Sequence, residues 1–172
     1  MAEAAEEITR AMSPPDTKEG KYLTFTLGRE KYGIGILKIK EIIGLLPITT
    51  VPRTPEYVKG VINLRGKVIP VIDLKLRFGM ESGDYTERTC IIVVEIEGQA
   101  GTILCGTVVD SVSEVLHIKG EDIEAPPSFG ARLHTACILG MAKMEGGLNI
   151  LLDIDRVLNQ KEAVFQDEPL SP

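Results

Sequence analysis

Residues 60–74 read GVINLRGKVIPVIDL, and residues 140–154 read GMAKMEGGLNILLDI. At this offset of 80 residues seven apolar positions of the first stretch face apolar residues of the second, and three residues are identical, namely Gly60 and Gly140, Gly66 and Gly146, and Asp73 and Asp153. The pattern predicts a strand, a tight turn and a second strand, because a glycine in the turn supplies the positive φ that a hairpin needs. The sequence therefore contains one structural unit twice.

Each predicted hairpin is followed by a predicted short helix. Asp73 and Asp153 stand where an N-cap is expected, since an aspartate side chain accepts hydrogen bonds from the first free backbone N–H groups. The helices are expected to end at Gly79 and Asn159, the residue types that best tolerate a left-handed C-terminal cap.

A second correspondence lies upstream, where residues 33–43 match residues 106–116 at an offset of 73. The two correspondences divide the chain into sub-barrels of roughly 21–80 and 88–160, with strands free to cross between them. Each unit is too small to bury a sufficient core alone, so two units are expected to pack around a shared one. Short strands separated by turns favour an all-β fold of two small barrels.

Composition and charge restrict the function. The formal charge is −6, but residues 1–20 hold five acidic and two basic side chains, and residues 161–172 hold three and one. These ends are interpreted as mobile acidic tails. The remaining body, at about −1, lacks the basic surface that nucleic acid requires. No uncharged run approaches the length of a membrane span, so a cytoplasmic protein without membrane insertion is expected.

Catalytic and metal-binding motifs are not found in the sequence. The two histidines belong to no HExxH motif, and the three cysteines, Cys90, Cys105 and Cys137, have neither metal-ligand nor disulfide spacing. We therefore expect a protein without enzymatic activity, metal or cofactor. A small-barrel enzyme that uses one of the three thiols is the alternative from another functional class.

The two copies differ most at the hairpin turn, where NLRG in the first copy becomes KMEG in the second. Positions that match report the scaffold, and positions that differ are free to carry function. Arg65, which aligns with Glu145, is thus a candidate. Residues 52–77 contain six basic and two acidic side chains, a local charge of +4 that would suit a partner presenting carboxylates.

Four segments together resemble the chemotaxis coupling protein family, CheW: YLTFTLGREKYGIGILKIKEII, TPEYVKGVINLRGKVIPVIDL, GTVVDSVSEVL and ILLDIDRVL. The resemblance covers about residues 21–160. It implies two five-stranded SH3-like β-barrels packed on a shared hydrophobic interface. It also implies a non-enzymatic adaptor, which couples the cytoplasmic tip of transmembrane chemoreceptors to a CheA-type histidine kinase in membrane-associated polar arrays. A coupling module detached from another two-component regulator remains open as an alternative.

The resemblance also implies a receptor-binding surface, whose residues in this chain are Ile39, Glu41, Gly60, Arg65, Val112 and Val115. Ile39 and Val112 occupy equivalent positions of the two units, so an apolar groove lined from both barrels is expected. We further expect Arg65 to pair with Glu41 at the edge of this groove. The residues that face the kinase are not assigned.

Overall fold

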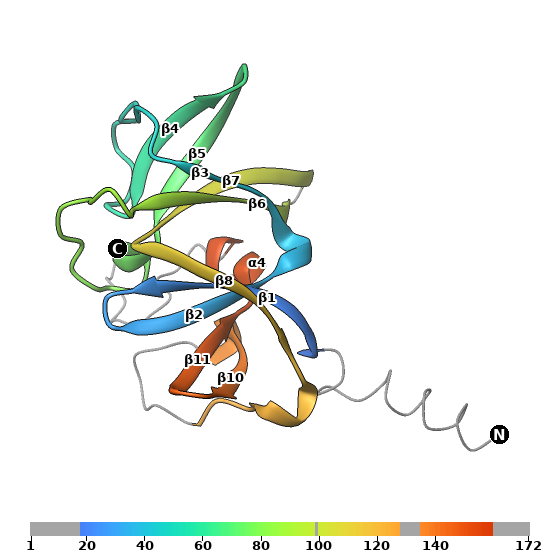
Figure 1. Cartoon of the computed structure of the whole chain (residues 1–172). Helices are drawn as coiled ribbons and strands as arrows, with labels where there is room; N and C mark the ends of the chain where they lie inside the picture. The colour runs from blue at the N-terminus through green and yellow to red at the C-terminus, as the bar shows by residue number, and fades with distance from the viewer. Residues whose placement is uncertain (1–17, 99, 128–134, 160–172) are drawn as a thin grey trace, which may run out of the picture.

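The computed structural model describes residues 18–98, 100–127 and 135–159. They form two mainly antiparallel β-sheets connected by short helical turns (Figure 1). The six-stranded sheet has the order β8-β1-β2-β11-β10-β9, with β1 (Gly20–Leu27), β2 (Glu30–Gly35), β8 (Ser111–Ile118), β9 (Ile123–Glu124), β10 (Ile138–Met144) and β11 (Gly147–Leu152). The five-stranded sheet has the order β3-β6-β7-β5-β4, with β3 (Ile39–Gly44), β4 (Val58–Leu64), β5 (Lys67–Asp73), β6 (Cys90–Gly98) and β7 (Gly101–Val109).

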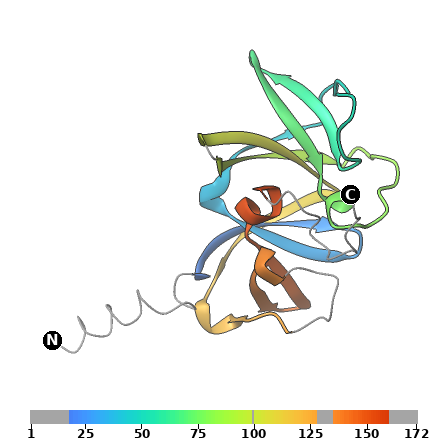
Figure 2. The same ribbon diagram turned by 180° about the vertical axis from the view of Figure 1, so that it is seen from behind.

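Helical segments in the described residues are short. They are the 3₁₀ turns η1 (Ile36–Lys38), η2 (Gly120–Asp122) and η3 (Thr135–Cys137), and the helices α3 (Leu74–Arg77) and α4 (Ile154–Asn159). Both views place α4 in the middle of the molecule, between the two sheets (Figures 1 and 2). Its Ile154 and Val157 are buried there.

The two predicted hairpins are confirmed, and they have the same register. Gly60 lies opposite Val71 in the β4–β5 ladder, and Gly140 lies opposite Leu151 in the β10–β11 ladder, 80 residues later. Both ladders shift register at this glycine. The repeated sequence therefore encodes a repeated hairpin, including its irregularity.

The predicted aspartate caps are confirmed as well. Asp73 Oδ1 accepts hydrogen bonds from the backbone N–H groups of Lys75 and Leu76, at 2.9 and 3.2 Å, at the start of α3. Asp153 Oδ1 accepts one from the N–H of Arg156, at 3.3 Å, in the first turn of α4. The helix α4 ends at Asn159, and Gly79 follows α3 with a φ of 78°.

The leading hairpins of the two units are exchanged between the sheets. The β1–β2 hairpin joins the strands of the second unit, where β2 runs parallel to β11 and Ile34 lies beside Leu152. The β6–β7 hairpin joins the strands of the first unit, where β7 runs parallel to β5 and Gly106 lies beside Val71. Figure 1 shows this as blue strands beside orange-red ones. The ranges 21–80 and 88–160 therefore do not coincide with the two sheets.

Each sheet curves around its own apolar cluster. Ile62, Ile69 and Val93 belong to a cluster supplied by β4, β5, β6 and β7 of the five-stranded sheet. Tyr22 and Leu151 belong to one supplied by the strands of the six-stranded sheet. Strands that all point side chains into one cluster form a small barrel, so the prediction of an all-β fold with two barrels is confirmed.

A third and larger cluster lies between the barrels. It combines Phe25 of β1, Val94 of β6, Leu74 of α3 and Ile154 of α4, all at most 2% exposed. This shared layer is the hydrophobic interface that the sequence resemblance implied. The strand count differs from the expected five in one barrel, because β9 adds a sixth strand. Its counterpart in the other barrel is the single bridge between Thr49 and Val61.

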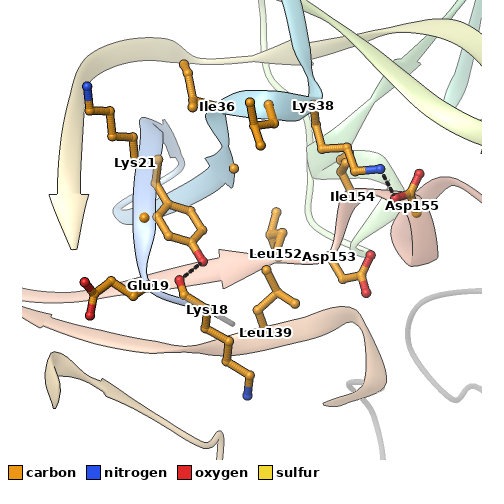
Figure 3. A pocket seen from close by; sticks show the side chains of 14 residues that line it. Lys18, Glu19, Lys21, Ile36, Lys38, Leu139, Leu152, Asp153, Ile154 and Asp155 are labelled. Carbon is orange, nitrogen blue, oxygen red and sulfur yellow. Dashed lines mark hydrogen bonds and ion pairs between the residues drawn. The ribbon is translucent and has the colours of Figure 1, made fainter. Parts of the chain in front are cut away.

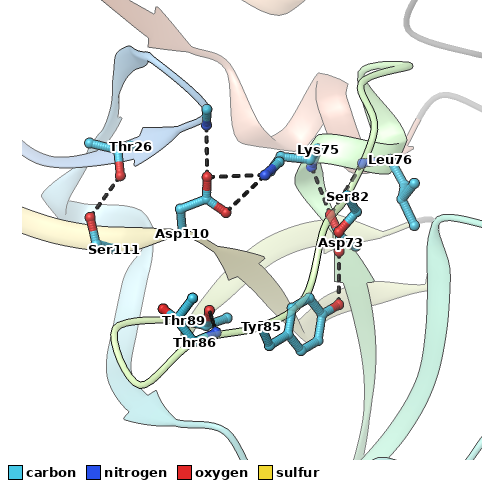
Figure 4. A network of polar contacts seen from close by, with 11 residues as sticks. Thr26, Asp73, Lys75, Leu76, Ser82, Tyr85, Thr86, Thr89, Asp110 and Ser111 are labelled. Carbon is cyan, nitrogen blue, oxygen red and sulfur yellow. Dashed lines mark hydrogen bonds and ion pairs between the residues drawn. The ribbon is translucent and has the colours of Figure 1, made fainter.

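Polar contacts fasten the segment between the two units to the shared layer (Figure 4). Asp73, 1% exposed, accepts hydrogen bonds from Ser82 Oγ and Tyr85 Oη, both at 2.8 Å, in addition to those from α3. Lys75 Nζ lies 3.2 Å from Asp110 Oδ2, and that carboxylate also accepts from the N–H of Gly28 at 2.7 Å. The turn of the exchanged β1–β2 hairpin is thereby held against α3.

Candidate partner-binding site

Arg65 and Glu41 form the ion pair that the sequence resemblance led us to expect. Arg65 lies in the turn between β4 and β5, and its Nη2 donates to Glu41 Oε2 on β3. The Arg65 side chain is 69% exposed and that of Glu41 is 30% exposed. Since β3 and β4 are the two edges of the five-stranded sheet, the pair also connects the ends of the curved sheet.

The backbone of Arg65 is in the left-handed region, with φ at 51°, and Gly66 follows with φ at 89°. Two consecutive positive values are typical of a type I′ hairpin turn, in which non-glycine residues other than Asn and Asp are uncommon. Asn63 Oδ1 supports the turn by accepting from the N–H of Gly66 at 2.8 Å. In the second unit φ is not positive at Glu145. It is positive at Gly146 and Gly147 instead. The two turns therefore differ in backbone as well as in charge.

Ile39 and Val112 lie at equivalent places on β3 and β8, the edge strands that pair with the exchanged hairpins. Ile39 pairs with Val94 on β6, and Val112 pairs with Phe25 on β1. Both side chains are half-buried and pack against the shared layer from opposite barrels. Val115, further along β8, is 48% exposed. The edge strands β3 and β8 thus bring apolar side chains of both units to the boundary between the barrels.

Gly60 is buried, unlike a typical contact residue. Its φ is 141°, and a Cβ at this position would lie 2.0 Å from the carbonyl oxygen of Thr49. The equivalent Gly140 is similarly tight, with a Cβ 2.5 Å from Cγ2 of Ile123. In both barrels a neighbouring segment crosses close to the register shift. The structure therefore gives Gly60 a packing role, which the repeat already indicated by conserving glycine in both copies.

The basic segment 52–77 does not form one patch. Arg77 is 3% exposed, its Nε donates to the carbonyl of Val157 at 3.0 Å, and its guanidinium lies 4.6 Å from the ring centre of Tyr57. Lys75 is paired with Asp110 as described above. The prediction of a basic surface with a local charge of +4 is wrong, because α3 directs these two cations inward.

A cavity near the crossover from β2 to β3 was not predicted from the sequence (Figure 3). It has a volume of about 510 Å³ and apolar walls that include Ile36, Leu139 and Leu152. Lys38 Nζ and Asp155 Oδ2 form an ion pair at its border, 2.5 Å apart. Leu37 beside it is 95% exposed. The only signal in the sequence was the apolar dipeptide Ile36 and Leu37 in the segment that joins β2 to β3.

The three thiols do not have the properties of a catalytic cysteine. Burial raises the pKa of Cys105 to about 12, and it also raises the pKa of Cys137. The pKa of Cys90 is raised by burial, although a hydrogen bond with the backbone of Val112 opposes the shift. A nucleophilic cysteine requires a lowered pKa and access to solvent. The geometry therefore argues against the thiol-enzyme alternative.

Comparison with known proteins places these features in a family. The family model described as the CheW-like domain matches residues 21–162. The chain belongs to the CheW-like family. The chemotaxis protein CheW of Klebsiella aerogenes is 39% identical over 152 residues, which cover 88% of this chain and 89% of the relative. The chemotaxis protein CheW of Helicobacter pylori is 32% identical over 159 residues, 92% of this chain and 93% of the relative.

A solved structure supports the same assignment. The crystal structure of the scaffolding protein TtCheW from Thermoanaerobacter tengcongensis matches with a TM-score of 0.74 and 38% sequence identity. The match covers 83% of this chain and 94% of that one. The CheW-like assignment confirms the function that the sequence resemblance implied, that of a chemotaxis coupling adaptor. None of the helices in the described residues is long and apolar enough to cross a membrane.

Proposed function

We propose that this CheW-like protein couples the cytoplasmic tip of transmembrane chemoreceptors to a CheA-type histidine kinase, and that it does so without catalysis. The receptor contacts the boundary between the barrels, where β3 and β8 carry Ile39 and Val112. The protein itself is cytoplasmic and reaches the membrane-associated arrays through these partners.

The observation that supports this proposal best is the ion pair between Arg65 and Glu41. An arginine in a left-handed turn is less favourable than a glycine or an asparagine, so the side chain rather than the turn accounts for its presence. Glu41, which accepts from the guanidinium, follows Ile39 by two residues on β3. A planar guanidinium offers several donors in fixed directions, which suits a carboxylate or a backbone carbonyl on a partner.

Val112 and Val115 complete the proposed surface from the other barrel. A receptor tip that contacts both barrels would bury apolar area beside a polar anchor, which is the usual anatomy of a specific interface. Gly60 belongs to this surface only indirectly. It allows the segment around Thr49 to cross β4, and so it maintains the shape of the hairpin that presents Arg65.

The test is reconstitution of the ternary complex. Purified protein, a receptor signalling fragment and the kinase are mixed, and kinase autophosphorylation is expected to exceed that of any pair of components. Arg65→Glu, which introduces the residue of the second copy, is expected to abolish receptor binding while the protein stays folded. Arg65→Lys is expected to bind weakly, since an ammonium lacks the planar donor set.

The matched control is Arg53→Glu. Arg53 is also exposed and also has a positive φ, 63°, but it lies outside the proposed surface. The Arg53→Glu variant changes the net charge by the same amount as Arg65→Glu, and it is expected to leave receptor binding intact. Equal losses in both variants would assign the effect to overall charge and contradict the proposed surface.

A further inference from the structure

A second cleft lies on the inner face of the six-stranded barrel, away from the boundary between the barrels. Its volume is about 480 Å³, and its walls include Leu116 of β8 and Met144 of β10. Thr24 of β1 and Asn149 of β11 also line it, and both are at most 4% exposed. We call this space the inner cleft.

The five-stranded barrel fills the equivalent space with aliphatic side chains. At the offset of 80, Asn149 corresponds to Ile69 and Met144 to Leu64, and both Ile69 and Leu64 are buried in the cluster of that barrel. At the offset of 73, Leu116 corresponds to Ile43, which packs against the same cluster.

The fourth equivalence follows from strand register. Thr24 lies opposite Gly33, and Val93 lies opposite Gly106, which is the counterpart of Gly33. Thr24 therefore corresponds to Val93, a fully buried member of the aliphatic cluster. The same fold can close this space with apolar residues and does so once, so the polar floor of the inner cleft is not a requirement of the architecture.

The amide of Asn149 is the unusual feature of this floor. Its side chain makes no hydrogen bond with another described residue, and although the residue is only 4% exposed, its amide atoms are not among the described side-chain atoms that are sealed from solvent, so the amide is open to the cleft. Thr24 is satisfied, because its hydroxyl donates to the carbonyl of Glu114 at 2.8 Å and accepts from the N–H of Glu114 at 3.2 Å. An amide that is open to a cleft and makes no hydrogen bond within the protein is free to donate to and accept from a ligand, so Asn149 is the polar group that a ligand in the cleft would engage.

The surroundings indicate the class of ligand. An asparagine amide offers one acceptor and an NH₂ donor, which match the N–H and C=O of a peptide unit. Leu116 and Met144 provide apolar walls for a side chain. Charges of both signs, such as Arg29 and Glu145, line the rim, so neither a phosphate nor a nucleic acid is favoured.

The strand β8 adds a backbone argument, because it is an edge of its sheet and Glu114 and Leu116 of this strand line the inner cleft. Edge strands pair readily with an extended chain. We propose that the inner cleft binds an extended peptide segment of a partner protein, with one aliphatic side chain against Leu116 and Met144 and a peptide unit on Asn149. The proposal does not depend on the receptor surface assigned above.

The experiment uses the full chain and a phage library of random linear peptides. The library is panned on the wild-type protein and counter-selected on Asn149→Ile, which copies the residue of the other barrel. Enriched peptides are expected to bind the wild type at least tenfold more tightly than Asn149→Ile. Val68→Thr, an exposed change on the other barrel, is the matched control and is expected to bind as the wild type does. Failure to enrich any peptide that distinguishes Asn149→Ile would overturn the proposal.

Two further measurements separate a binding role from a structural one. The melting temperature of Asn149→Ile is expected to rise, because an aliphatic side chain packs at this position as Ile69 does in the other barrel. In the wild type, a selected peptide at saturation is expected to shift the ¹³C-methyl NMR signal of Met144, with the distant Met80 as an internal reference. An unmoved Met144 signal would overturn the proposal, whatever the stability of the variant.

Discussion

The guanidinium of Arg65 reaches the carboxylate of Glu41 across the open side of one curved sheet, from a turn whose backbone is unfavourable for arginine. At these exposures an ion pair contributes only about 0–1 kcal/mol to stability. The left-handed φ of Arg65 costs a similar amount, of order 1 kcal/mol, and so offsets the stabilisation by the ion pair. Arg65 is therefore close to neutral for folding, which is the behaviour of a residue whose side chain serves recognition.

Arg65→Gly is expected to stabilise the protein slightly and to remove receptor binding. Glycine adopts a φ of 51° without strain, so the unfolding free energy should stay equal or rise by up to about 1 kcal/mol in a urea titration. Arg53→Gly removes the same strain and should keep receptor binding. If Arg65→Gly bound the receptor normally in a pull-down, Arg65 would not be part of the contact.

Gly60→Ala is expected to destabilise the protein by more than about 3 kcal/mol, because the added methyl group would overlap the backbone of Thr49. Gly44→Ala on β3 is the control, since its Cβ would meet nothing within 4 Å, and its effect should stay within about 1 kcal/mol. Chemical denaturation of both variants measures the difference. Equal stability of the two variants would refute the packing role of Gly60.

Stability is expected to fall above about pH 9. The thiol of Cys105 has a pKa raised to about 12 by burial, whereas an exposed thiol in the unfolded chain titrates near its ordinary value. A raised folded-state pKa means that the contribution is complete below the unfolded pKa and is lost as pH rises towards 12. Burial also raises the pKa of Tyr85, and its hydrogen bond to Asp73 adds to the shift in the same direction.

Urea midpoints between pH 7 and pH 10.5 measure this loss. Each buried thiol can contribute about 1.4 kcal/mol per pH unit within its window. Cys105→Ala is expected to be less stable at pH 7 but to show a flatter profile above pH 9. An unchanged slope in this variant would exclude Cys105 as the source.

Asp73→Ala is expected to cost about 2–4 kcal/mol, because it removes the cap of α3 and leaves the hydroxyls of Ser82 and Tyr85 without their buried acceptor. Proteolysis should then cut the segment between α3 and β6 before the rest of the chain. Asp153→Ala, which removes the shallower cap of α4, should cost less. Thermal unfolding of both variants tests this: the melting temperature should fall further in Asp73→Ala than in Asp153→Ala, and the reverse order would contradict the prediction.

The sequence predicted those parts of the fold that depend on local pattern. The offset of 80 located both hairpins and both aspartate caps, since a turn glycine and a capping side chain act within a few residues. It could not show which strands are neighbours, because apolar alternation identifies the buried face and not the partner strand. The exchange of β1–β2 for β6–β7 therefore became visible only in three dimensions.

The candidate site was predictable to a similar degree. The pair of Arg65 and Glu41 followed from family resemblance, and the structure contains it. Counting charges along residues 52–77 failed because neighbours in sequence point in different directions, as buried Arg77 and exposed Arg65 show. The left-handed φ of Arg65 was hidden as well, since an alignment with Glu145 assumes that both turns have one backbone.

The exchanged hairpins also determine when the protein can fold during synthesis. The strand β2, made early, needs β11, near the end of the folded region, as its parallel neighbour, because Ile34 pairs with Leu152. On a ribosome that adds about 5–20 residues per second, the first hairpin must wait several seconds for this partner. Its apolar face has no native cover during that interval. A cell that makes this protein therefore depends on chain completion, rather than on stepwise folding from the N-terminus, to hide its earliest strands.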